Sequence, residues 1–147
     1  MSFVGIMLFL AWFLPYADRR SLLVYADSGG LRYAGLALNV LGAAMRVAAA
    51  VTLGKQLSGY VTLQKDHELV TRGIYGVMRH PMYAGLLLAF PGWALVLRSQ
   101  LTIPLLVVIL VFVILRIGQE EKLLAEHFGA EFAAYRQRTW RLLPYIY

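Results

Sequence analysis

The sequence predicts an all-α integral membrane protein with about four transmembrane helices, a tight helical hairpin and an amphipathic C-terminal helix on the cytoplasmic side. Sixty per cent of its 147 residues are apolar and only 15% are charged, against about 25% in an ordinary soluble domain. A soluble domain of about 150 residues still leaves roughly 30% of its unfolded surface in water. This much apolar surface therefore requires a bilayer, and residues 1–147 form a single domain at this length.

Four apolar stretches are the candidate membrane spans, and they cover residues 3–16, 31–53, 81–97 and 101–117. About 20 apolar residues cross the hydrocarbon, so the second stretch is long enough and the first is short. The second stretch contains small residues at about four-residue spacing, which let helices approach closely in lipid. These are Gly35, Gly42, Ala44 and Ala48. Only residues 98–100 separate the last two stretches, which predicts the hairpin.

Basic residues predict the orientation. Four spans place both termini and the loop over residues 54–80 on one side of the membrane. That side holds nine basic residues: Lys55, Lys65, Arg72, Arg79, Arg116, Lys122, Arg136, Arg138 and Arg141. The other side holds four: Arg19, Arg20, Arg32 and Arg98. The side richer in Lys and Arg is cytoplasmic in membrane proteins, so we expect the loop and the C-terminal tail to meet there.

The net charge of +6 favours membrane lipids with anionic headgroups as partners and no nucleic acid, because the basic residues form no dense run. Arg46 lies inside the second stretch. We expect its side chain to snorkel toward the cytoplasmic interface; the alternative is a charge that lines a cavity.

The absence of cysteine excludes disulfides, thiolate catalysis and Cys-ligated metal sites. The three histidines, His67, His80 and His127, are not paired at metal-ligand spacing. The sequence therefore predicts no metal site.

The loop before the third stretch has the pattern of a polar pocket. Pro81 suits the first turn of a helix, which puts His80 at the cap position. The free N–H groups and the dipole of such a helix end suit a carboxylate or a phosphate. Further donors and rings come from Arg79, Tyr75 and Tyr83. The pattern predicts a site for an anionic or zwitterionic ligand at the membrane surface; the alternative is an ordinary interfacial girdle of such residues.

A second cluster follows the hairpin. Arg116 and Glu120 are four residues apart, so they share a helix face and can pair. An apolar stripe at helical spacing comes next, formed by Leu124, Phe128, Phe132 and Tyr135. The stripe predicts an amphipathic tail helix that lies on the membrane or closes over the loop.

Together, these segments resemble the isoprenylcysteine carboxyl methyltransferase family and its phospholipid methyltransferase relatives, over roughly residues 55–147. The matching patterns are His-x-Leu-Val-x-x-Gly-x-Tyr at 67–75, Arg-His-Pro-x-Tyr-x-Gly at 79–85, Arg-x-x-x-Glu-Glu at 116–121 and Phe-Gly-x-x-Phe-x-x-Tyr at 128–135. These families are multi-pass integral membrane enzymes. The resemblance therefore implies methyl transfer from S-adenosylmethionine to a lipophilic small-molecule substrate at the cytoplasmic face.

The resemblance also implies site residues. The adenosine end of the cofactor would be held by His67, Glu68, Leu69 and Val70, and the rest of it by Tyr75, His80, Pro81, Met82 and Tyr83. The catalytic pair would be Arg116 and Glu120, at the junction with the substrate. Glu120 is the candidate base for a thiol or amine acceptor, and Arg116 could orient a carboxylate acceptor.

Two alternatives share parts of this pattern. Membrane sterol reductases have a similar Arg-His-Pro-x-Tyr-x-Gly segment and a similar tail, but they bind a nicotinamide cofactor. A small membrane protein could also keep the scaffold without catalysis. Because the larger methyltransferases of the family have more N-terminal helices, a homo-oligomer in which a second copy supplies them is a further expectation.

Overall fold

The computed structural model describes residues 29–54, 68–100 and 102–145, together with residues 12, 13, 15, 16, 19 and 20. Its elements are helix α2 (Gly29–Leu53), the 3-10 helix η2 (Gly73–Gly76), and helices α3 (Pro81–Val96), α4 (Thr102–Phe128) and α5 (Ala130–Gln137). The described part of the chain is helical, as predicted. Of the candidate span at residues 3–16, the structure describes only residues 12, 13, 15 and 16, and the rest of this span lies outside the described residues.

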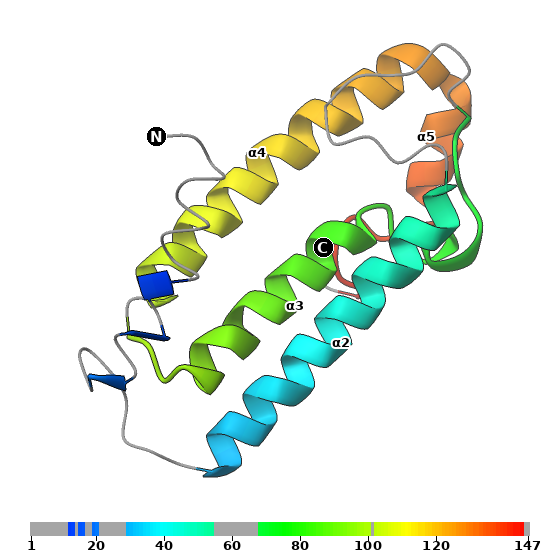
Figure 1. The fold of residues 1–147 in the computed structure, drawn as a ribbon. Helices are drawn as coiled ribbons and strands as arrows, with labels where there is room; N and C mark the ends of the chain where they lie inside the picture. The colour runs from blue at the N-terminus through cyan, green and yellow to red at the C-terminus, as the bar shows by residue number, and fades with distance from the viewer. Residues whose placement is uncertain are drawn as a thin grey trace.

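Helices α2, α3 and α4 run alternately up and down, and α5 folds back from the end of α4 (Figure 1). The short connection between α3 and α4 makes the predicted hairpin. Two of the described helices, α2 and α4, are long and apolar enough to cross a membrane, whereas α3 has only 16 residues. The described part of the chain is therefore built on membrane-length helices, and the count of four spans stays a prediction.

The last helix of the hairpin is longer than predicted. The apolar stretch ends at residue 117, but α4 has 27 residues and continues to Phe128. At 1.5 Å per residue it is about 40 Å long, and the hydrocarbon is about 30 Å thick. One end of α4 therefore extends beyond the bilayer core and carries residues 118–128 with it.

The predicted single amphipathic tail helix was wrong in one respect, because Gly129 breaks it. Gly129 has φ 51, a conformation that glycine adopts at little cost and other residues rarely adopt. Leu124 and Phe128 therefore belong to α4, whereas Phe132 and Tyr135 belong to α5.

Glycines set the contact between α2 and α3. A Cβ atom built on Gly42 would lie 2.5 Å from the carbonyl oxygen of Gly85, and one built on Gly35 would lie 2.7 Å from that of Gly92. The reverse contacts are as close: Gly85 and Gly92 would each place a Cβ 2.6 Å from the facing glycine carbonyl. The two backbones therefore approach too closely for any side chain at these four positions.

The residues of α2 that face α3 recur every seven positions, because Ala49 is buried together with Gly35 and Gly42. The predicted close approach was right for the two glycines. It was wrong for Ala44 and Ala48, which are exposed. Two residues along a helix is a rotation of about 200°, so Ala44 faces away from the side that Gly42 shares with α3.

Arg46 is exposed on α2, and its side chain covers Gly85: a Cβ built there would lie 2.6 Å from Arg46 Cγ. The methylene stem of the side chain thus uses space that the glycine leaves open. This placement is compatible with snorkelling, which stays a prediction.

The close approach of α2 and α3 can be tested with a single methyl group. We expect Gly42→Ala to lower the free energy of unfolding by about 1–3 kcal/mol, because the new methyl group meets backbone that cannot move away. Gly118→Ala is the matched control in α4, where a built Cβ meets nothing within 4 Å. Thermal unfolding in detergent compares the two, and equal stability of both variants and the parent would contradict the glycine contact.

Candidate active site

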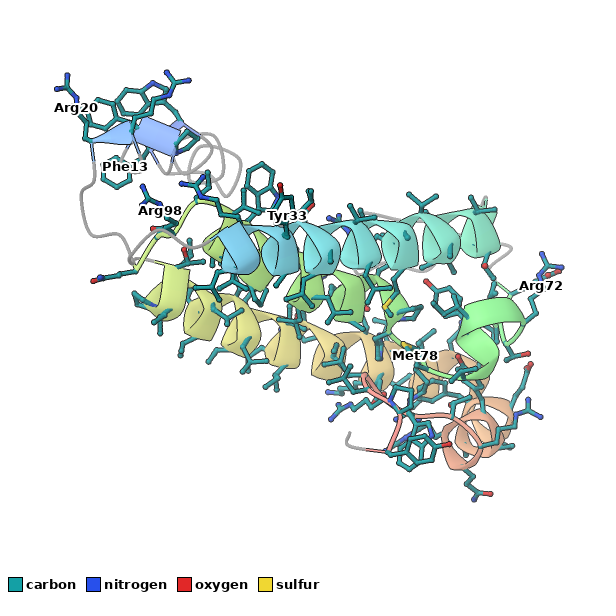
Figure 2. The ribbon with its side chains drawn as sticks, turned by 90° about the horizontal axis from the view of Figure 1, so that it is seen from below. Phe13, Arg20, Tyr33, Arg72, Met78 and Arg98 are labelled. Carbon is teal, nitrogen blue, oxygen red and sulfur yellow. The ribbon has the colours of Figure 1, made fainter. Side chains whose placement is uncertain are left out.

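The loop before α3 and the C-terminal tail meet at one end of the helices, as predicted. The N–H of Arg79 donates to the carbonyl of Trp140 at 2.8 Å, and the N–H of Trp140 donates to that of Val77 at 3.0 Å. The N–H of His80 donates to the carbonyl of Arg141 at 3.2 Å. Figure 2 shows Arg72 and Met78 toward this end, with Arg20 and Arg98 at the opposite one.

Three polar side chains form a hydrogen-bonded group between α3 and α4. The Tyr83 hydroxyl donates to Glu120 Oε1. Arg116 Nε donates to the Tyr83 hydroxyl at 2.6 Å and to Glu120 Oε1 at 3.2 Å. The predicted pairing of Arg116 with Glu120 is therefore confirmed. Both side chains keep about a quarter of their surface exposed, so a ligand can reach the guanidinium and the carboxylate.

His80 lies beside this group at the predicted cap position of α3, directly before Pro81. The histidine is buried, and its ring centroid is 5.9 Å from that of Tyr83. Its two nitrogens face two different carboxylates. Nδ1 is 3.8 Å from Glu120 Oε2, and Nε2 is 3.4 Å from Glu121 Oε1.

Glu121 is a buried carboxylate for which the sequence motifs indicated no role. Arg79 Nε lies 2.9 Å from its Oε1, and Arg141 Nε lies 3.1 Å from its Oε2. One carboxylate thus joins the start of α3, the end of α4 and the tail. The pair of adjacent glutamates was the sequence signal that could have revealed this role of Glu121. Neighbouring residues on a helix point about 100° apart, so Glu120 and Glu121 cannot both face one site.

Arg79 was expected to offer donors to a ligand, and this expectation is corrected. Its guanidinium binds Glu121, the carbonyl of Arg136 at 3.2 Å, and both the carbonyl and the hydroxyl of Thr139. The side chain is only 9% exposed. Its donors are therefore used to hold the tail rather than to hold a ligand.

The tail closes over the loop, which decides between the two predicted uses of its apolar stripe. Phe132 and Tyr135 are buried, and the Tyr135 hydroxyl donates to the carbonyl of Tyr75 at 2.7 Å. Burial raises the pKa of Tyr135 to about 12. Burial, followed by the nearby Tyr135 and Glu120, also raises the pKa of Tyr75. Both phenols therefore stay protonated at neutral pH.

A separate cavity of about 430 Å³ lies where α2 ends. It is lined by Val51, Thr52, Leu53, Gly54, Glu68, Leu69, Val70, Thr71 and Arg72. Its volume falls in the range of small-molecule sites. Three of the four residues expected at the adenosine end thus line one cavity, while the fourth, His67, lies outside the described residues.

The other expected cofactor residues lie elsewhere in the same end of the molecule. Tyr75 is buried in η2. His80 and Tyr83 belong to the polar group described above, at the start of α3. Between them, Pro81 is fully buried and Met82 is half-buried in the first turn of that helix.

Comparisons with known proteins assign the fold to a membrane methyltransferase family. The profile of the phospholipid methyltransferase family matches residues 31–131, which include nearly all of α2 and the whole of α3, α4 and the polar group. The chain belongs to the phospholipid methyltransferase family.

Individual relatives are more specific. A protein-S-isoprenylcysteine O-methyltransferase of Saccharomyces cerevisiae is 38% identical over 119 residues, which are 76% of this chain and 48% of the yeast protein. Protein-S-isoprenylcysteine O-methyltransferase B of Arabidopsis thaliana is 33% identical over 115 residues, 76% of this chain and 58% of the plant protein. The chain thus spans about half the length of these relatives.

A solved structure has the same fold. The eukaryotic intramembrane Ras methyltransferase, an isoprenylcysteine carboxyl methyltransferase, matches with a TM-score of 0.73 and 33% identity, over 79% of this chain and 43% of that one. The resemblance inferred from the sequence motifs is therefore confirmed. These three relatives are methyltransferases, which favours that class over the sterol-reductase alternative.

The contact between the tail and the loop can be tested at Tyr135. We expect Tyr135→Phe to cost about 1–3 kcal/mol, because the buried carbonyl of Tyr75 loses its donor. Hydrogen exchange should then become faster at residues 73–80. Tyr145→Phe is the matched control, since Tyr145 is 87% exposed, and it should leave exchange unchanged. Equal exchange in both variants would show that the hydroxyl of Tyr135 does not hold the loop.

Proposed function

We propose that this protein is an S-adenosylmethionine-dependent methyltransferase that acts at the cytoplasmic membrane surface on a lipophilic acceptor with a carboxylate, of the isoprenylcysteine kind. The observation that carries the proposal is the Tyr83–Glu120–Arg116 group, hydrogen-bonded and partly open at one end of the membrane helices. The names of the relatives support the acceptor class. A lipid amine or a small thiol or acid is compatible with the same group.

The residues present fit the methyl donor in three respects. The cavity at the end of α2 is large enough for a nucleoside, and Leu69 and Val70 offer apolar surface to a base. Glu68 offers a carboxylate to ribose hydroxyls or an exocyclic amine. Glu120 offers an acceptor for the ammonium group, and the first turn of α3 offers N–H groups and a positive dipole for the carboxylate.

S-adenosylmethionine supplies an activated methyl group on a sulfonium. The protein must then align the acceptor with that methyl group and exclude water. Arg116 can orient an acceptor carboxylate through paired N–H donors, while Tyr83 and Glu120 hold the Arg116 side chain. A carboxylate acceptor needs no base; for a thiol or amine, Glu120 is the group in position to take the proton.

Binding measurements on variants test the cofactor assignment. We expect His80→Ala to weaken S-adenosylmethionine binding by about 1–3 kcal/mol, or roughly 5- to 150-fold, and Tyr83→Phe to weaken it less. Arg116→Lys should spare cofactor affinity and lower turnover, because a point charge cannot replace the planar guanidinium. Arg20→Ala, at the opposite end of the molecule, is the control. Calorimetry on each folded variant would overturn the assignment if His80→Ala bound as tightly as the parent, or if the parent bound only NADPH.

The orientation is tested separately. The nine-to-four distribution of basic residues supports a site on the cytoplasmic side. A reporter fused after residue 147 should therefore read as cytoplasmic, and an external signal would reverse the proposed orientation.

A further inference from the structure

The tail, residues 138–145, returns to the level of the membrane surface. Helix α4 carries residues 118–128 beyond the bilayer core, and α5 folds back from its end. Leu142 then packs in one buried cluster with Ala84, in the first turn of α3, and Ile117, the last residue of the apolar stretch of α4. At this end of the molecule the apolar parts of α3 and α4 stop at these two residues. The tail therefore lies at the membrane interface, near Met78 and away from α2 (Figure 2).

The two sides of the tail have different neighbours. Thr139 and Arg141 are half-buried and face the protein. The carbonyl and the hydroxyl of Thr139 accept hydrogen bonds from Arg79, and Arg141 binds the buried carboxylate of α4. Arg138 and Trp140 alternate with them along the chain and are exposed. One side of this short segment therefore holds the loop before α3, and the other side faces outward.

The outward side carries two aromatic rings that pack on each other. Trp140 is 42% exposed and Tyr145 is 87% exposed, and their ring centroids are 5.4 Å apart. In water these rings would leave a large apolar area unburied. Trp and Tyr are enriched at membrane interfaces, because the ring can lie among lipid while its N–H or O–H reaches water. At the level of the tail, lipid is the environment that suits both rings.

The same surface is positively charged. Residues 132–147 contain three arginines and no acidic residue. Arg141 is held by Glu121. Arg136 and Arg138 are exposed, and neither forms an ion pair with another described residue. Basic side chains beside a membrane surface attract anionic lipids, so both guanidinium groups are available to phosphate groups at the interface.

We propose that the end of α5 and the outward side of the tail form a lipid-binding surface for anionic phospholipids. Its members are Arg136, Arg138, Trp140 and Tyr145. The arginines bind the phosphate groups, and the rings lie just below them, among the glycerol and upper acyl groups. Because the inward side of the same segment binds Arg79, lipid bound outside holds the tail against the loop before α3. The surface contacts neither the methyl donor nor its acceptor, so it stands independently of the proposed function.

The position of Trp140 can be measured by fluorescence. The chain has three tryptophans, Trp12, Trp93 and Trp140, so Trp12→Phe combined with Trp93→Phe leaves Trp140 alone. We expect its emission to be quenched in vesicles of phosphatidylcholine brominated on the upper acyl chain. In the otherwise unchanged chain, Trp140→Phe should remove part of the total quenching, which gives the same answer if the double variant does not fold. Unquenched Trp140 emission in either comparison would overturn the proposal.

The preference for anionic lipid is tested by hydrogen exchange of the full chain in nanodiscs. We compare discs of phosphatidylcholine alone with discs that also contain phosphatidylglycerol. We expect residues 77–80 and 138–141 to exchange about fivefold or more slowly with phosphatidylglycerol, because each arginine near an anionic surface contributes about that factor. Arg136→Gln combined with Arg138→Gln should abolish the difference between the two kinds of disc.

Lys122→Gln is the matched control. Lys122 lies on the extension of α4 at the same end of the molecule, and its side chain is 80% exposed. The variant removes an exposed positive charge outside the lipid-binding surface, so it should keep the lipid difference in full. Equal exchange of the parent in both kinds of disc would overturn the proposal. So would a loss in Lys122→Gln as large as that in the arginine variant, or the same slowing by inorganic phosphate in phosphatidylcholine discs.

Discussion

The contacts of Glu121 with Arg79 and Arg141 hold the functional end of the molecule together. The three residues come from the end of α4, the loop before α3 and the tail, so the carboxylate joins three segments. Among the described residues, one β-bridge, between Met78 and Trp140, also joins the loop to the tail. Removing one partner of a buried ion pair costs about 3–5 kcal/mol, because the remaining charge is left uncompensated. The position of His80, and with it the polar group on α3 and α4, depends on this arrangement.

The adjacent residues Glu120 and Glu121 have different partners and different roles at the site. Successive residues of a helix point about 100° apart, so Glu121 turns toward the arginines of the loop and tail while Glu120 turns toward Tyr83 and Arg116. The buried carboxylate of Glu121 stabilises the fold, and the partly exposed carboxylate of Glu120 remains within reach of a ligand. A single acidic residue could not serve both purposes, because a carboxylate saturated by arginines has little capacity left for another donor.

Local sequence patterns predicted much of this molecule. Helical spacing alone indicated the pairing of Arg116 with Glu120, and the short connection at residues 98–100 indicated the hairpin that brings the loop and the tail together. The partners of Arg79 could not be read in the same way, since Glu121 and Thr139 are 42 and 60 residues away along the chain. The predicted helix contact at Ala44 and Ala48 was wrong for a related reason. A spacing of four residues describes one helix, whereas the contact with α3 follows the seven-residue spacing that two packed helices share. The break between α4 and α5 at Gly129 could not be predicted, because glycine permits the backbone conformation found there but does not require it.

The pairing of the tail with the loop also bears on the order of assembly during synthesis. The Tyr135 hydroxyl bonds to the carbonyl of a residue 60 positions earlier, and the hydrogen bonds of Trp140 join segments just as distant. The helices can enter the membrane one after another as they leave the ribosome, but the hydrogen bonds of residues 77–80 with Trp140 and Arg141 cannot form until the tail has followed. The glycine-mediated contact of α2 with α3 can therefore form early, whereas the site is completed only after α5 and residues 138–141 have been made. A ribosome that pauses within α5 would leave an inserted hairpin whose buried carboxylate, Glu121, still lacks Arg141.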